Sequence, residues 1–266
     1  MKKKIVNSIP ILFLVIVFPG FVKIQKPTLF IIGDSTVKNG KIANNQKQVG
    51  WGELLSSYLD SSSINVENDA VPGRSSRTYI TEGHWQKVLD KMHKGDYLLL
   101  QFGHNDAGNI ADSLKPRGSL RGISDDSAHV YNHVLQRDEY VHSYGWYLRK
   151  IIDEATAKGV LPIVVSPIPR HIFNNGKVLR ADSDYGLWAK QTAQTEHVPF
   201  LDLNNRVADI YDSLGFDKTS VLFPQDHTHT NREGATINVR QIIAAIEEQP
   251  DLSPLRKYLI EENEKP

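Results

Sequence analysis

The chain has 266 residues, 40% hydrophobic and 23% charged, a composition typical of a globular protein with a substantial core. Its length suits one α/β domain of ordinary size. The formal net charge is +0, but five lysines and no acidic residue precede Pro27, so the remainder carries 26 basic and 31 acidic residues. A mildly acidic domain is poorly suited to binding phosphates, so we expect no nucleic-acid partner. The absence of cysteine excludes disulfides and a lipid-modified cysteine.

The first 26 residues have the composition of a secretory leader. Lysines at positions 2–4 precede an apolar run over residues 9–22, which two prolines and a glycine interrupt. This pattern predicts a signal peptide within residues 1–26 and export to the periplasm or the extracellular space. No Ala-x-Ala cleavage site follows the run, so an uncleaved N-terminal membrane anchor is the alternative.

Beyond the leader, short apolar runs alternate with segments whose apolar residues recur at helical spacing. This alternation is typical of βαβ units. It predicts one domain over residues 27–250 with a parallel sheet covered on both faces, followed by a charged tail over 251–266 with little to bury. The predicted strands cover residues 28–33, 64–68, 96–102, 161–166 and 199–203. The predicted helices cover residues 50–59, 87–92, 140–158, 182–196, 207–214 and 233–247.

One long segment, residues 107–138, lacks periodicity and is rich in Gly, Ser, Asp and His. A loop of this length in a compact domain is usually functional or disordered. Because it directly follows the carboxyl end of a predicted strand, we interpret it as a binding loop.

Ser35 lies in Gly-Asp-Ser-Thr, where the first predicted strand ends. In an open α/β sheet, ligands bind in the crevice beyond the strand ends, so this hydroxyl is well placed for chemistry. Two other interpretations remain at this point: a helix N-cap, and part of a phosphate-binding loop.

An acid and a base stand three residues apart in Gln-Asp-His-Thr-His, just before the last predicted helix. His229 can take the proton of a serine, while Asp226 orients the imidazole and stabilises its charged form. The alternative is a metal site, in which His227 and His229 bind the ion with Asp226.

Acyl transfer also needs hydrogen-bond donors for the oxyanion. Asn105 can supply a side-chain amide, Gly73 a backbone N–H close to the substrate, and Ser35 its own N–H. Both Asn105 and Gly73 also suit ordinary turns.

Taken together, these residues resemble the four sequence blocks of the SGNH (GDSL-type) hydrolases. The blocks are Gly33-Asp-Ser35, Gly73 in Pro-Gly-Arg-Ser-Ser-Arg, Gly103-His-Asn-Asp106 and Asp226-His-Thr-His229, and within the superfamily they are most similar to rhamnogalacturonan acetylesterases. The resemblance implies a flavodoxin-like three-layer α/β/α sandwich with a five-stranded parallel sheet. It also implies Ser35 as nucleophile, His229 as base, Asp226 as its partner, and Ser35, Gly73 and Asn105 as the oxyanion hole, with no metal and no cofactor.

Other residues near these blocks have two interpretations each. Arg74 and Arg77 can meet a galacturonate carboxylate or lie solvated in a loop. His104 is a substrate-binding candidate, although with Asp34 it is better suited to holding the loops by hydrogen bonds. The aromatic residues Trp51, Tyr79 and Trp85 suit either the core or a sugar-binding platform.

The sequence therefore predicts a secreted serine esterase that removes O-acetyl groups from a plant cell-wall polysaccharide, with rhamnogalacturonan as the expected substrate. The alternatives are a lipase or thioesterase, an acetylxylan-type esterase, a carbohydrate-binding protein without turnover, and a metal-dependent hydrolase. The polar character of residues 107–138 favours a sugar over a long acyl chain.

Overall fold

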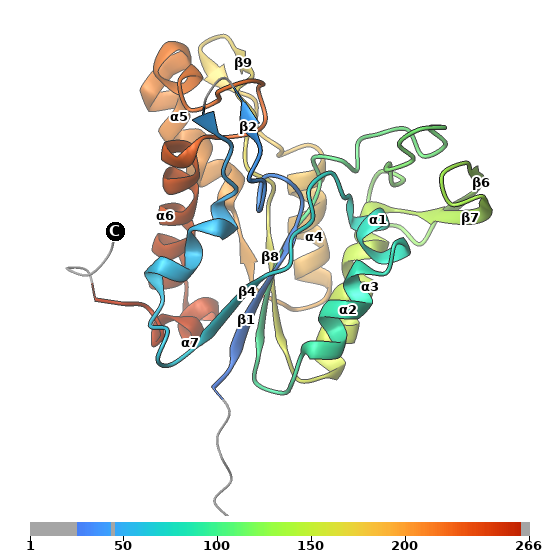
Figure 1. Ribbon diagram of the computed structural model, residues 1–266, viewed down its shortest axis with the longest axis horizontal. Helices are drawn as coiled ribbons and strands as arrows, with labels where there is room; N and C mark the ends of the chain where they lie inside the picture. The colour runs from blue at the N-terminus through green and yellow to red at the C-terminus, as the bar shows by residue number, and fades with distance from the viewer. Residues whose placement is uncertain (1–25, 44–45, 262–266) are drawn as a thin grey trace, which may run out of the picture.

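Five parallel strands form the central sheet of the computed structural model, which describes residues 26–43 and 46–261 (Figure 1). Their order across the sheet is β11-β8-β5-β1-β4, and every neighbouring pair is parallel. The strands are β1 (Thr28–Gly33), β4 (Asn65–Asn68), β5 (Tyr97–Gln101), β8 (Leu161–Val165) and β11 (Phe200–Leu201). The chain leaves β1 for β4 on one side and then crosses to β5 on the other. The crevice for a ligand is therefore expected beyond the carboxyl ends of β1 and β5, because the connections that follow these two paired strands run to opposite sides.

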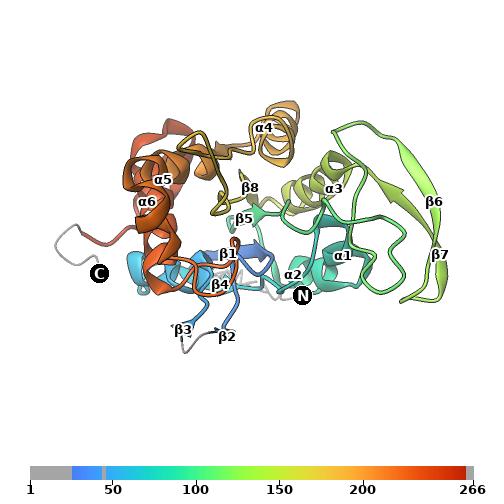
Figure 2. The ribbon, with the colours of Figure 1, turned by 90° about the horizontal axis from the view of Figure 1, so that it is seen from above.

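Helices cover both faces of the sheet (Figure 2). One face packs against α1 (Ser76–Thr81), α2 (His84–Lys91), α3 (Tyr144–Ala157) and α4 (Tyr185–Thr195). The other packs against α5 (Leu203–Ser220), α6 (Arg232–Glu248), α7 (Ser253–Arg256) and the 3₁₀ helices η1 (Trp51–Glu53), η2 (Leu55–Tyr58) and η3 (Pro250–Leu252). The predicted three-layer sandwich is thereby confirmed.

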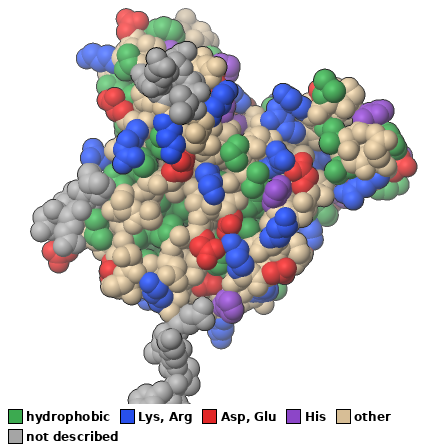
Figure 3. Space-filling view, in the orientation of Figure 1, with side chains coloured by type: hydrophobic (Ala, Val, Ile, Leu, Met, Phe, Trp, Pro, Cys, Tyr) green, Lys and Arg blue, Asp and Glu red, His purple; other side chains and the backbone are tan. Residues whose placement is uncertain are grey.

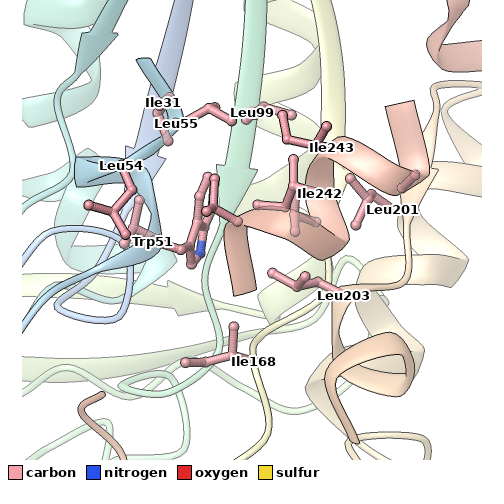
Figure 4. Close-up of a cluster of buried hydrophobic side chains, with 14 of the residues drawn as sticks. Ile31, Trp51, Leu54, Leu55, Leu99, Ile168, Leu201, Leu203, Ile242 and Ile243 are labelled. Carbon is pink, nitrogen blue, oxygen red and sulfur yellow. The ribbon is translucent and has the colours of Figure 1, made fainter. Parts of the chain in front are cut away.

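The alternation of side chains along β1 explains its continuous apolar run. Leu29 and Ile31 point into the core beneath α5 and α6, whereas Phe30 and Ile32 point into the core beneath α1 to α4. All four are essentially inaccessible, and burying each such side chain contributes about 1.5–3 kcal/mol. Figure 4 shows Ile31 and Leu99 from the sheet close to Trp51 and Ile242.

Several predicted element boundaries are wrong. Residues 50–59 form η1 and η2 rather than one α-helix, and Gly50 and Gly52 in this stretch disfavour a regular helix. The predicted helix at 207–214 is longer, and Gly215 (φ 77°, ψ 171°) breaks it inside α5. In addition, α1 was not predicted, and Ser75 caps it by accepting a hydrogen bond from the Thr78 N–H.

The segment expected as an irregular loop contains a β-hairpin. Strands β6 (Ser127–Asn132) and β7 (Arg137–His142) pair antiparallel and project from the domain beside α1 and α3 (Figures 1 and 2). Since β7 extends to His142, α3 begins at Tyr144, and the expected helix start at residue 140 is wrong. Two further short pairs are β2 (Ile42–Ala43) with β3 (Gln46–Lys47), and β9 (Phe173–Asn174) with β10 (Lys177–Val178).

The segment after Gln249 also differs from expectation. Leu252 and Leu255 are completely buried in the core beneath α6, and Leu259 forms a β-bridge with Leu59. The expectation that this segment has little to bury is therefore wrong up to this point, because hydrophobic residues are interspersed among the charges.

The three aromatic residues with two interpretations all belong to the core: Trp51, Tyr79 and Trp85 are at most 2% exposed. On the face shown in Figure 3, basic and acidic side chains are interspersed. Within residues 26–43 and 46–261, no helix has the length and apolar character needed to cross a membrane. The predicted leader lies outside the described residues.

Candidate active site

Ser35 lies in a tight turn directly after β1. The Asp34 carboxylate accepts hydrogen bonds from the Thr36 N–H (2.8 Å) and hydroxyl (2.7 Å), which fixes the turn. Gly33 is required before it, since an added Cβ would lie 2.6 Å from the carbonyl oxygen of Gln101. This turn holds the Ser35 hydroxyl beyond the carboxyl end of the strand, where it is part-buried.

His229 meets Ser35 from the loop between α5 and α6. Its Nε2 is 2.8 Å from the Ser35 Oγ, although the two residues are 194 positions apart. Its Nδ1 is 2.8 Å from Oδ2 of Asp226, so the ring is held from both sides. The loop itself is anchored at Thr230, whose hydroxyl donates to the Val49 carbonyl (3.0 Å). With Nδ1–H donating to the carboxylate, Nε2 is left to accept the serine proton.

Asp226 is held in its charged form. Burial raises the pKa of this carboxyl. Hydrogen bonds from the His229 ring and from the backbone N–H groups of His229 and Thr228 lower it by more, so the pKa is about 2. The carboxylate therefore stays ionised at neutral pH and can stabilise a positively charged imidazole.

The turns that carry Gly73 and Asn105 lie beside the Ser35 turn. Val71 donates its N–H to the Gly33 carbonyl (2.9 Å), which places the Gly73 turn at the end of β1. On the other side, Nδ1 of His104 is 3.5 Å from Oδ2 of Asp34, so the residues preceding Asn105 and Ser35 contact each other. The structure thus gathers the predicted oxyanion residues around the predicted nucleophile.

Arg117, which the sequence does not single out, connects Gly73 to Asn105. Its Nη1 donates to the Asn105 side-chain oxygen (2.8 Å) and to the Gly73 carbonyl (3.1 Å). A guanidinium can only donate, so the amide atom facing it must be the oxygen, and the amide NH₂ is directed the other way, toward the Arg74 carbonyl (3.0 Å). Arg117 therefore sets the orientation of the Asn105 amide. It lies in an aperiodic stretch, where no sequence pattern reveals such a role.

Arg77 neither faces a substrate nor lies solvated in a loop, so both interpretations from the sequence are wrong. It is completely buried and forms a bidentate ion pair with Glu139 on β7 (2.9 and 2.8 Å). It also donates to the carbonyls of Ile110 and Gly118. This arginine ties the inserted segment of residues 107–142 to α1, because the buried charge needs all of these partners.

The other two substrate-binding candidates are partly engaged elsewhere. Arg74 is partly exposed and paired with Glu82 (2.5 Å). His104 is 6% exposed, and its Nε2 is 3.0 Å from the Ile168 carbonyl. With its contact to Asp34, His104 connects the loops after β1, β5 and β8, in agreement with a loop-holding role.

Asp106 is a completely buried carboxyl next to Asn105. Its pKa is raised to about 6, because burial and, to a smaller extent, the nearby Asp34 outweigh the lowering effect of hydrogen bonds from the Ser76 hydroxyl and N–H. Ser119 of the inserted segment also donates to it (3.3 Å). Asp106 thus connects the Asn105 turn to α1 and to the insertion.

A metal site is not supported by the geometry. Both ring nitrogens of His229 are engaged, one by Ser35 and one by Asp226. His227 is exposed and its Nε2 lies 3.4 Å from a guanidinium nitrogen of Arg170. In the part of the chain that the structure describes, no three His, Cys, Asp or Glu side chains are grouped to hold an ion.

Residues 31–237 match the model of the GDSL-like lipase/acylhydrolase family. This chain belongs to that family. Membership makes it a carboxylic ester hydrolase, and it agrees with a serine at the end of β1 that is hydrogen-bonded to a histidine.

Among curated proteins, this family member is 30% identical over 220 residues to a rhamnogalacturonan acetylesterase from Emericella nidulans, covering 82% of this chain and 84% of that protein. It is 31% identical over 239 residues to a probable rhamnogalacturonan acetylesterase from Bacillus subtilis, covering 88% and 98%.

Solved structures have the same fold. The protein YxiM from Bacillus subtilis aligns with a TM-score of 0.66 at 25% identity, over 85% of this chain and 57% of that one. An acetylxylan esterase from Geobacillus stearothermophilus aligns with a TM-score of 0.55 at 19% identity, over 84% and 95%.

Proposed function

We propose that this chain is an exported carbohydrate acetylesterase that removes O-acetyl groups from rhamnogalacturonan through a Ser-His-Asp mechanism. The observation that carries the mechanism is the hydrogen-bonded series from Ser35 through His229 to Asp226, with 2.8 Å at both contacts. It supplies a nucleophile, a base and an orienting acid in one chain of contacts.

In the first half of the reaction, the Ser35 oxygen attacks the acetyl carbonyl while its proton moves to Nε2 of His229. The resulting oxyanion accepts hydrogen bonds from the backbone of Ser35 and Gly73 and from the Asn105 amide. As the intermediate collapses, the bond to the sugar oxygen breaks, and that oxygen takes the proton from His229. The products of this half are a free sugar hydroxyl and an acetyl-enzyme.

In the second half, water attacks the acetyl-enzyme and gives its proton to His229. The bond to Ser35 then breaks, the proton on His229 returns to the serine oxygen, and acetic acid leaves and ionises to acetate in solution. Asp226 keeps its charge throughout, as the low pKa of about 2 requires.

Two observations support an acetylated pectic substrate. The relatives from Emericella nidulans and Bacillus subtilis are named rhamnogalacturonan acetylesterases and cover most of this chain. The cavity beside the site carries charged side chains, including Arg170, Arg180, Asp182 and Asp184, among apolar ones, so it offers hydrogen-bonding groups to a polar sugar. A lipase or thioesterase is the less favoured alternative, because the named relatives are carbohydrate acetylesterases. An acetylxylan-type esterase is the remaining alternative.

The test compares acetate release from acetylated rhamnogalacturonan, acetylated xylan and a long-chain acyl ester, using the wild type and Ser35→Ala with and without a chelator. We expect the highest kcat/KM on the pectic substrate, no effect of the chelator, and loss of activity by at least about 10³-fold in Ser35→Ala.

Each other outcome of this comparison would reject a different part of the proposal. Preference for xylan or for the long-chain ester would keep the mechanism and reject the substrate. Retention of activity in Ser35→Ala would reject the nucleophile, while loss on chelation would revive the metal site.

Export is supported by the basic and apolar leader in residues 1–26. Expression of the full chain and of a chain lacking residues 2–26, followed by cell fractionation, tests it. Recovery of both proteins in the cytoplasm would reject export, and recovery of the full chain with the membrane would indicate an uncleaved anchor.

A further inference from the structure

A cavity of about 690 Å³ lies next to the candidate active site. It is bordered by the loop after β5, the loop after β8, the β9–β10 hairpin and the turn before α4. His104 and Arg170 connect it to the reaction centre, because His104 precedes Asn105 and Arg170 contacts Thr228, the neighbour of His229. A sugar adjoining the acetylated one would therefore have room in this cavity.

Arg170 is held there by both loops of the site. One guanidinium nitrogen donates to the Thr228 hydroxyl and lies 3.4 Å from His227 Nε2, and the other donates to the His104 carbonyl (3.1 Å). None of these partners is a carboxylate. Within the described residues, Arg170 forms no direct ion pair. Burial lowers the pKa of its guanidinium, while the more distant carboxylates of Asp34, Asp226 and Asp184 act in the opposite direction.

The other charges around the cavity are arranged differently. Arg180 and Lys177 also line it, but Arg180 pairs with Asp209 and Asp212 (both 2.8 Å), and Lys177 pairs with Asp212 (3.4 Å). The carboxylates of Asp182 and Asp184 line the side formed by the turn before α4. Arg170 thus differs from the other two cations of this cavity. In the described part of the chain, no carboxylate lies within 4 Å of its guanidinium.

We infer that Arg170 binds the carboxylate of a uronic acid residue of the substrate in the cavity beside the reaction centre. This inference rests on the proposed function and explains how the site would select rhamnogalacturonan, which contains galacturonate, over the neutral backbone of xylan. A guanidinium has five N–H donors in a planar fork that matches a carboxylate, and the two hydrogen bonds to Thr228 and His104 leave others for the ligand. A carboxylate would also compensate the partly desolvated charge.

The test measures kcat/KM on acetylated rhamnogalacturonan oligosaccharides and on the same oligosaccharides after reduction of their carboxyl groups. The ratio of the two kcat/KM values is the selectivity ratio. A general effect of a substitution on the adjoining catalytic loop changes both values equally and cancels in this ratio. For Arg170→Gln we expect the ratio of the two values to fall about tenfold or more, through KM, since a hydrogen bond to a charged group is lost. Arg170→Lys should lie between Arg170→Gln and the wild type.

Lys177→Gln is the matched control, because it removes a paired cation from the same cavity and should leave the ratio unchanged. An Arg170→Gln ratio equal to that of the wild type, in a protein with unaltered thermal unfolding, would overturn the inference. So would an equal loss of selectivity in Lys177→Gln.

A binding measurement on the inactive variant Ser35→Ala tests this inference separately from the proposed function. Calorimetric titration of Ser35→Ala with digalacturonate should give binding that the double variant Ser35→Ala/Arg170→Gln loses. If Ser35-dependent acetate release from the pectic substrate holds but digalacturonate binding does not depend on Arg170, only the inference fails. If the wild type does not deacetylate rhamnogalacturonan, the proposed function fails, whatever the titration shows.

Discussion

The two sides of the site are held in different ways. On the acid–base side, Asp226 contacts His229 and the backbone of Thr228 and His229, so most of the geometry arises within four consecutive residues. On the oxyanion side, Gly73 and Asn105 are connected by Arg117, which is 44 and 12 positions away from them. The acid–base side is a local structure, whereas the oxyanion side depends on the docking of an inserted segment.

The insertion at residues 107–142 therefore stabilises the oxyanion side of the site in addition to bordering it. It carries Arg117, which sets the Asn105 amide, and Glu139, which buries Arg77 on α1. Damage to the insertion should therefore affect the oxyanion side and leave the acid–base side intact.

The acid–base side should be sensitive to a single charge. Asp226→Asn keeps the size of the side chain but removes the charge that holds the His229 tautomer, so we expect kcat to fall by roughly 10³- to 10⁴-fold. His227→Gln, two residues from His229 and exposed, should change kcat by less than about threefold in the same assay. Retention of more than a tenth of the activity in Asp226→Asn would contradict a local acid–base unit.

The attachment of the insertion should be the costliest structural contact to break. Arg77→Met leaves Glu139 buried without its partner, so we expect the free energy of unfolding to fall by about 3–5 kcal/mol, measured by urea denaturation. Arg74→Met removes a partly exposed pair with Glu82 and should cost no more than about 1 kcal/mol. Equal values for the two variants would show that the buried pair is not a specific anchor.

The buried carboxyl beside Asn105 should make stability depend on pH. The folded-state pKa of Asp106 is about 6 and its ordinary value is 3.8, so the folded protein binds this proton more tightly than the unfolded chain. Its contribution, of the order of 3 kcal/mol, is complete below about pH 4 and is lost as the pH rises through 6.

Asp106→Asn mimics the protonated carboxyl and should remove this dependence. Between pH 4 and pH 7, the decrease in unfolding free energy should be about 2–2.5 kcal/mol smaller in the variant than in the wild type. The same decrease in both proteins would assign the pH dependence to other groups.

Loss of the contact that orients the Asn105 amide should have the smallest effect of the four. The amide NH₂ of Asn105 remains present and only loses its fixed orientation. For Arg117→Gln we expect kcat to fall about 10- to 100-fold with little change in KM, less than the removal of an oxyanion donor costs. Added guanidinium ion should restore part of kcat, and Lys115→Gln, an exposed neighbour, should resemble the wild type. A change confined to KM would show that Arg117 contacts the substrate instead.

Much of the fold and the residues of the candidate site could be predicted from the sequence. The apolar run of β1 and the Gly-Asp-Ser turn depend on neighbours in the chain, and so do the contacts between Asp226 and His229. The α/β alternation predicted the parallel sheet, because strand and helix periods differ along the chain. The pairing of Ser35 with His229 was one of several interpretations of these residues, and the resemblance to a family favoured it over a metal site.

The tertiary structure alone decided the rest. Whether an arginine binds substrate or is buried depends on what packs against it, and here Arg77 meets Glu139 across 62 positions of sequence, Arg117 meets Asn105, and Arg170 lines a cavity. The β6–β7 hairpin was missed because its strands alternate only weakly in hydrophobicity. Local sequence patterns predict periodicity and turns. They do not predict the partner of a long charged side chain, because that partner depends on how distant segments pack together.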